Sequence, residues 1–172
     1  MKTRIVQFFA IGSLFAMTVI ASETMMHTDV PYAPVTVELL ERFHGHLGPN
    51  VALGACMGEY AIVKYGIPRY FGVTVEVECP KEPPVSCIID GLQMTTGATY
   101  GKKNIIHIPK DEIQVAIQND RTKQRIVFQL KPSTKAMLKK WAEENMDVEE
   151  RGLKCFAMKA EDLFDIAVEA GQ

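Results

Sequence analysis

The stretch PNVALGACMGEYAIVKYG, residues 49–66, sets the centre of the expected fold. Pro49 suits the first position of a helix, and Gly66 suits the position just after its end. Between them the apolar residues lie on nearly every side of the helix, so we expect this helix to be buried centrally. A membrane-spanning helix is excluded here, because Glu59 and Lys64 lie inside the apolar run.

Gly54 and Gly58 lie four residues apart in this helix and would let a second backbone approach closely. Downstream, residues 73–79 alternate strictly between apolar and polar side chains, which is the pattern of a half-buried strand. The other expected helices cover residues 36–43, 87–97, 132–146 and 147–158, and the other expected strands cover residues 104–108, 112–120 and 124–130. Thr36 and Ser86 are the expected N-caps of the first two of these helices.

This order of elements predicts an α+β fold, a single domain in which helices pack on one mostly antiparallel β-sheet. The chain has 172 residues, which is enough for one domain with a sizeable core. Residues 161–168 follow no pattern that assigns them to a helix or a strand. The net charge of −2 and the lack of a basic run interleaved with aromatic residues give no support for nucleic-acid binding.

The N-terminal residues have the layout of a secretory signal peptide. Lys2 and Arg4 precede an uncharged apolar stretch, and Val19 and Ala21 supply small residues for a cleavage site. We therefore expect a signal peptide at residues 1–21, a linker at residues 22–34 and the folded domain at residues 35–172. The mature protein would then be periplasmic or extracellular, without a membrane span.

Two of the four histidines lie one residue apart in RFHGHLGPN, residues 42–50. In an extended backbone, side chains two residues apart point to the same side, so His44 and His46 can reach one metal ion. Gly45 relaxes the backbone between them. A single H-x-H pattern has little specificity by itself, and a structural turn is the alternative interpretation.

Cys87 follows two prolines and begins the expected helix at residues 87–97. A helix N-terminus lowers the pKa of a thiol and favours the thiolate, which ligates metals or attacks electrophiles. The alternative is a disulfide between Cys79 and Cys87, because an oxidising compartment permits it. Asp90, one turn further, is a candidate metal ligand, a partner of a ligand, or a first-turn acid that suits the helix dipole. For an enzyme, Cys87 and Asp90 are the candidate catalytic residues.

The segment TTGATYGKKN, residues 95–104, has the composition of a phosphate-binding loop but not its spacing. Lys102, Thr96 and Thr99 are the candidate residues for binding a small anionic ligand or cofactor at this turn. A tight turn with solvated lysines is the alternative. His107 alternates with isoleucines in an expected strand, which is typical of a half-buried structural histidine, although it could also approach the metal.

Two segments together resemble the FmdE family, which is named after a component of formylmethanofuran dehydrogenase. FHGHLGPNVALGACMGEYA, residues 43–61, is similar to the family motif F-H-G-H-L-C/G-P. SCIIDGLQMTTGATYGKKNI, residues 86–105, is similar to the family motif C-x-x-D-(A/G)-(I/L)-Q-x-x-T-G-x-T-x-G-K-x-N. The positions that match the second motif are Cys87, Asp90, Gln93, Thr96, Gly97, Thr99, Gly101, Lys102 and Asn104.

The resemblance implies an α+β domain, commonly dimeric, with a metal bound between the His motif and the later Cys. His44, His46 and Cys87 match these implied ligand positions. This chain has Gly48 where many members have Cys, so one thiolate ligand is missing. Cys155 stands alone where many members have a Cys-rich zinc-finger extension, so we expect no such module. The family name also implies association with a molybdenum or tungsten enzyme of one-carbon metabolism, a cytoplasmic role that an exported protein does not fit.

We therefore hypothesise an exported metal-binding protein in which His44, His46 and Cys87 hold a divalent transition metal. Two imidazoles and a thiolate suit zinc first, with iron, nickel or copper as alternatives. Three protein ligands leave an open position for water or a small ligand. The first hypothesis for its role is an accessory or carrier module, as a homodimer or with a redox-complex partner. The second is a metal-dependent enzyme for a small anionic or one-carbon substrate, and the third is a thiol-redox protein that uses Cys79 and Cys87.

Overall fold

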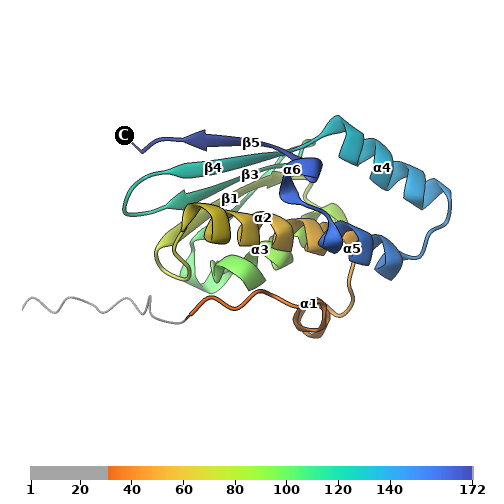
Figure 1. Ribbon diagram of the computed structural model, residues 1–172, viewed down its shortest axis with the longest axis horizontal. Coiled ribbons are helices and arrows are strands. Elements are labelled where there is room, and N and C mark those ends of the chain that lie inside the picture. Colours follow the sequence, from red (N-terminus) through yellow and green to blue (C-terminus); the bar gives the residue numbers. More distant parts are fainter. Residues whose placement is uncertain (1–30, 172) are drawn as a thin grey trace, which may run out of the picture.

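A curved five-stranded sheet forms one layer of the computed structural model, which describes residues 31–171 (Figure 1). Its strands are β1 (Val73–Cys79), β2 (Ile105–Pro109), β3 (Gln114–Asn119), β4 (Arg125–Leu130) and β5 (Phe164–Glu169). They lie in the order β2-β1-β3-β4-β5, and only the β1–β2 pair is parallel. The expected mostly antiparallel sheet is confirmed, and β3 and β4 form an antiparallel hairpin within it.

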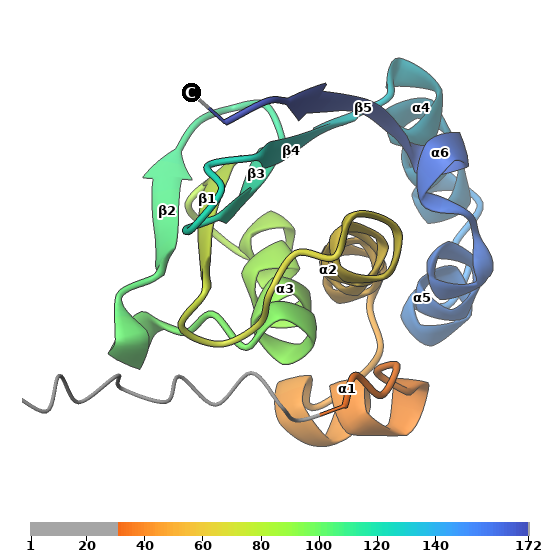
Figure 2. The same ribbon diagram turned by 60° about the vertical axis from the view of Figure 1, so that its left-hand side comes forward.

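The helices are α1 (Val37–His44), α2 (Pro49–Tyr65), α3 (Ile88–Thr96), α4 (Pro132–Glu143), α5 (Val148–Ala157) and α6 (Ala160–Leu163), with 3-10 turns η1 (Val85–Cys87) and η2 (Tyr100–Lys102). Figure 2 shows α2 and α3 side by side under the sheet, with α1 on their far side. Among the helices of residues 31–171, none is long and apolar enough to cross a bilayer. The α+β fold is confirmed, whereas the expected signal peptide and residues 22–30 lie outside the described residues.

The core lies between the sheet and the α2–α3 pair. Strand β1 buries every second side chain, which follows from its strict alternation of apolar and polar residues. From the helices, Leu53 and Met57 of α2 and Leu92 of α3 are fully buried in the same cluster. Burying each such side chain contributes about 1.5–3 kcal/mol, so the contact between the sheet and these helices stabilises the fold.

Two glycines of α2 let α3 pack closely, as the sequence predicted, one against its backbone and the other against a side chain. A Cβ added at Gly54 would lie 2.0 Å from the carbonyl oxygen of Ile88. Further along α2, a Cβ added at Gly58 would lie 1.9 Å from Oγ1 of Thr95. The contacts advance in the same direction on both helices, so α2 and α3 run parallel and their N-termini lie at the same end.

Two local expectations need correction. The N-cap of α3 is Cys87 rather than Ser86, because the chain already turns as the 3-10 segment η1 before the helix begins. The residues that followed no pattern divide into the short helix α6 and the edge strand β5. Their periodicity is weak because the helix has one turn and the strand, which pairs only with β4, exposes most of its side chains.

Candidate functional site

A cavity of about 460 Å³ lies where the turn between α1 and α2 meets the N-terminus of α3. His44 and His46 border this cavity from the turn, and Cys87 borders it from the N-cap of α3. Because α2 and α3 are parallel, these two segments meet at one end of the helix pair although they are distant in sequence. The three expected metal ligands therefore border the same cavity. We call this space the histidine cavity.

The backbone between the two histidines is turned, so the expectation of an extended segment is wrong. His44 is the last residue of α1, and Gly45 is its C-cap with a φ of 96°. A residue with a Cβ would be strained at this φ, which explains the glycine. The turn still places the two imidazoles close together, with their ring centroids 5.0 Å apart.

Asp90 holds the ring of His44 in place. Nδ1 of His44 donates a hydrogen bond to Oδ2 of Asp90 over 2.7 Å, and the His44 side chain is only 11% exposed. Nε2 of Gln93 lies 3.4 Å from the other carboxylate oxygen. With Nδ1 engaged, Nε2 is the nitrogen of His44 that is left for a ligand. This is the usual arrangement of a metal-binding histidine, whose second nitrogen donates to a carboxylate.

The pKa of the Cys87 thiol is raised, so the expectation of a lowered pKa is wrong. Burial of the sulfur is the main cause, the negative charge of Asp90 adds to it, and a backbone hydrogen bond opposes both. A helix N-terminus stabilises a nearby negative charge by only about 0.3–1 kcal/mol, and desolvation outweighs this contribution. Cys87 therefore stays a thiol at neutral pH unless a bound cation displaces its proton.

The donor groups share one cavity but do not converge on one point. Within residues 31–171, no three His, Cys, Asp or Glu side chains lie close enough together to hold an ion. The donor set fits a borderline transition metal, for which imidazole and thiolate are the common ligands. His44 is fixed by Asp90, whereas His46 is exposed and has room to rotate. Binding of an ion would require new rotamers of His46 and Cys87.

Three basic side chains that the sequence analysis did not select also border the histidine cavity. They are Lys135 and Lys139 of α4 and Arg151 of α5. Both lysines pair with glutamates. Arg151 forms no ion pair within residues 31–171, and its Nε is buried without a hydrogen-bond partner. No sequence signal distinguishes Arg151 from the other charged residues of an amphipathic helix, because only the tertiary fold brings it to the cavity.

In this structure, the candidate anion-binding residues of the glycine-rich turn form hydrogen bonds that stabilise the turn itself. The Thr96 hydroxyl is buried and bonds to backbone atoms on both sides. Thr99 is the N-cap of η2, and the Lys102 ammonium donates to the carbonyl oxygen of Gly97 over 3.0 Å. None of these three side chains is among the described residues that border the histidine cavity. Their role in binding an anion stays a prediction.

His107 and Cys79 contact each other away from the histidine cavity. Nε2 of His107 lies 3.4 Å from Sγ of Cys79 and 3.2 Å from its carbonyl oxygen. Cys79 is fully buried, and burial raises the pKa of its thiol. Cys79 and Cys87 are both free thiols in this structure. Of the two interpretations of His107, the structural one matches its position.

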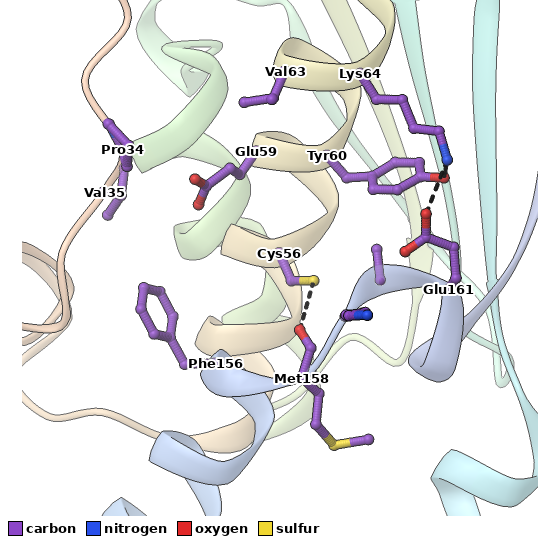
Figure 3. Close-up of a pocket in the computed structure, with 12 residues that line it drawn as sticks. Pro34, Val35, Cys56, Glu59, Tyr60, Val63, Lys64, Phe156, Met158 and Glu161 are labelled. Atoms are coloured by element: carbon purple, nitrogen blue, oxygen red, sulfur yellow. Dashed lines mark hydrogen bonds and ion pairs between the residues drawn. The ribbon is translucent and has the colours of Figure 1, made fainter.

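A second cavity, of about 590 Å³, lies on the other side of α2 (Figure 3). Its polar side is closed by a network in which Nζ of Lys64 contacts the Tyr60 hydroxyl at 2.6 Å and Oε1 of Glu161 at 2.9 Å. Cys56 lies above the carbonyl of Met158, and burial raises the pKa of its thiol to about 12. Because these groups satisfy one another or stay protonated, the histidine cavity is the better candidate for chemistry.

The sequence model of the FmdE family, described as molybdenum formylmethanofuran dehydrogenase operon, matches residues 43–168. The chain belongs to this family. The match spans every residue placed around the histidine cavity above, from the two histidines to Arg151, and the resemblance drawn from the two motifs is thereby confirmed.

Two relatives illustrate how far this family relation extends. A probable S-adenosyl-L-methionine-binding protein of Archaeoglobus fulgidus is 35% identical over 86 residues, which are 45% of this chain and 22% of that protein. The chain thus spans less than a quarter of that relative. A crystal structure of a tungsten formylmethanofuran dehydrogenase FmdE-like protein from Syntrophus aciditrophicus matches with a TM-score of 0.54 and 19% identity, covering 79% of this chain and 71% of that one. This second likeness supports the fold alone.

Proposed function

We propose that this chain is a metal-binding member of the FmdE family, in which His44, His46 and Cys87 bind a divalent transition metal ion. Zinc is the first choice, with iron, nickel or copper as alternatives. The observation that supports this most directly is the bond between Nδ1 of His44 and Asp90, which leaves Nε2 for a ligand beside a second imidazole and a thiol. Three protein ligands leave one position open.

We further propose an accessory or carrier role rather than turnover. A bound ion would supply Lewis acidity to a carbonyl or to water. A catalytic base must also be available to the substrate, yet one oxygen of Asp90 accepts from His44 and the other faces Gln93. We therefore assign Asp90 to holding His44. An enzyme for a small anionic or one-carbon substrate is the second candidate, favoured by the open volume beside the proposed ligands.

Export and a homodimer are part of this proposal. The signal-peptide pattern of residues 1–21 supports export, and the resemblance to a commonly dimeric family supports the dimer. Intact-mass measurement of protein from the producing cell, together with light scattering, tests both. A mature chain that retains residues 1–21 would contradict export, and a monomer mass at working concentration would contradict the dimer.

The test of the metal site is metal content after anaerobic purification without added metal, measured by elemental mass spectrometry. We expect about one ion per wild-type chain and loss of that ion in His46→Ala and in Cys87→Ser. His107→Ala and Cys56→Ser are the matched controls, because neither residue borders the histidine cavity, and both should keep the ion. A metal-free wild type, or equal loss in the controls, would refute the site.

We do not propose the thiol-redox function. It requires both Cys79 and Cys87 to exchange with a partner, whereas Cys79 is fully buried in β1 and contacts His107. A buried thiol with a raised pKa is a poor nucleophile, because the thiolate is the reactive form.

A further inference from the structure

The wall of the histidine cavity is largely apolar and its charged rim is basic. Its aliphatic side chains are Val51, Val85, Ile113, Leu130, Leu138 and Val148. They come from α2, η1, the loop before β3, the end of β4, α4 and the start of α5. None of the described residues that border this cavity is an Asp or a Glu. The proposed metal ligands make no use of this apolar surface.

Arg151 is the basic residue of this rim that has no counter-ion among residues 31–171. The ammonium of Lys135 bonds to Glu112, and the ammonium of Lys139 lies 3.7 Å from the carboxylate of Glu143. The Nε of Arg151, by contrast, is buried and makes no hydrogen bond. Because Arg151 borders the cavity and its charge is not balanced by a carboxylate among the described residues, its guanidinium is the cation of this rim that is left to pair with a bound anion.

The size and lining of the cavity indicate which anion fits. A volume of about 460 Å³ falls in the range of small-molecule sites, which is about 300–1,000 Å³. A free phosphate or formate would leave the exposed part of the aliphatic wall, such as Val148, in contact with water. An anion with a hydrocarbon body would cover that wall, and a guanidinium receives a planar carboxylate through two parallel hydrogen bonds.

We propose that the histidine cavity binds an organic carboxylate with a short aliphatic body, its carboxylate held by Arg151 and its hydrocarbon chain by the six aliphatic side chains. This inference deepens the proposed function by naming a ligand class for the same cavity. It requires no metal ion, since Arg151 and the aliphatic wall belong to the protein itself.

The test is an NMR titration of the full chain after removal of metal by a chelator, with three six-carbon probes and acetate. We expect hexanoate to bind more tightly than hexan-1-ol and acetate, and n-hexylammonium to bind least. The amide shifts should centre on Ile113, Leu138 and Val148, and the cavity of Figure 3 should be unaffected. Equal affinity for hexanoate and hexan-1-ol, or no binding of hexanoate, would overturn the proposal.

Substitutions of Arg151 test whether its guanidinium holds the carboxylate of hexanoate. Arg151→Gln should weaken hexanoate binding about tenfold and leave the affinity for hexan-1-ol unchanged. The hexanoate affinity of Arg151→Lys should lie between those of the wild type and Arg151→Gln. Arg121→Gln, in the exposed turn after β3, is the matched control and should bind like the wild type. If Arg151→Gln binds hexanoate normally, the assignment of Arg151 is wrong. If Arg151→Gln does not fold, the order of affinities of the four probes for the wild type still tests the carboxylate site.

The carboxylate site and the metal site can fail separately. Hexanoate binding that depends on Arg151, in a wild type that already lacks metal when it is purified anaerobically and before any chelator is added, would refute the metal proposal and retain the carboxylate site. About one metal ion per chain, with hexanoate bound no more tightly than hexan-1-ol, would support the metal site and refute the carboxylate site. His46→Ala and Cys87→Ser should lose the ion and retain hexanoate binding.

Discussion

At the scale of the residue, Gly48 occupies the position of the resembled motif F-H-G-H-L-C/G-P at which either Cys or Gly is expected. Its φ of −110° and ψ of 164° are extended backbone that any residue adopts, so the fold does not demand glycine here. A Cβ added at Gly48 would lie 3.4 Å from Nε2 of His46 and 3.9 Å from Cγ2 of Val148. A side chain at this position would therefore contact His46 at the cavity.

We predict that Gly48→Cys strengthens metal binding. The new thiolate would supply a further soft donor next to His46, so the zinc affinity should rise about tenfold or more. A competition titration against a chromophoric chelator measures this, with Gly48→Ala as the control that adds a Cβ without a donor. If both variants bind zinc alike, position 48 does not face the bound ion.

At the scale of the element, the close contact of α2 and α3 decides where the site lies. A Cβ added at Gly91 would lie 2.0 Å from the carbonyl oxygen of Val51, which repeats from the side of α3 the contact that Gly54 makes from α2. Both distances are to backbone atoms, which cannot rotate away. The two helix N-termini can share one cavity only because these positions lack side chains.

We predict that Gly54→Ala destabilises the protein by about 1–3 kcal/mol or more, because the helices must separate to admit a methyl group. Denaturant unfolding followed by circular dichroism measures the change. Gly101→Ala is the matched control, since a Cβ there meets nothing within 4 Å, and its effect should stay within about 0.5 kcal/mol. Equal effects of the two substitutions would mean that the helices tolerate a wider spacing.

Helices and strands with a strong local sequence pattern were predictable, whereas contacts between residues distant in sequence were not. The alternation of β1, the proline and glycine that bound α2, and the small residues of its α3 face all have local causes. The raised pKa of Cys87 has a tertiary cause, burial together with Asp90, and outweighs the local effect of the helix end. Arg151 reaches the histidine cavity only through the packing of α5, so no spacing in the sequence identifies it.

At the scale of the whole molecule, α6 and β5 connect the edge of the sheet with the central helix α2. Strand β5 pairs with β4 at the edge of the sheet, and α6 precedes it beside α2 (Figure 1). Oε1 of Glu161 in α6 accepts from Lys64 of α2 at 2.9 Å. The same ammonium lies 4.7 Å from the centroid of the Tyr60 ring. This network is a polar link between α2 and α6.

We predict that this link weakens in acid. The hydrogen bond from Lys64 and its neighbours lower the pKa of Glu161 from 4.5 to about 2. A carboxylate whose pKa is lower in the folded state contributes stability above its unfolded pKa and loses it as the pH falls through the folded value. The stability lost in Glu161→Gln should therefore be constant near neutral pH and shrink between pH 4.5 and about 2.

The effect should be small at neutral pH, because both side chains are half exposed and water screens the pair. Urea unfolding of the wild type and Glu161→Gln across this pH range measures it, with Glu78→Gln on β1 as the control for removing a carboxylate that forms no ion pair within residues 31–171. A difference that stays constant down to pH 2 would show that Glu161 acts through packing rather than charge. A difference that vanishes in high salt as well as in acid would confirm that the ion pair fastens α6 to α2.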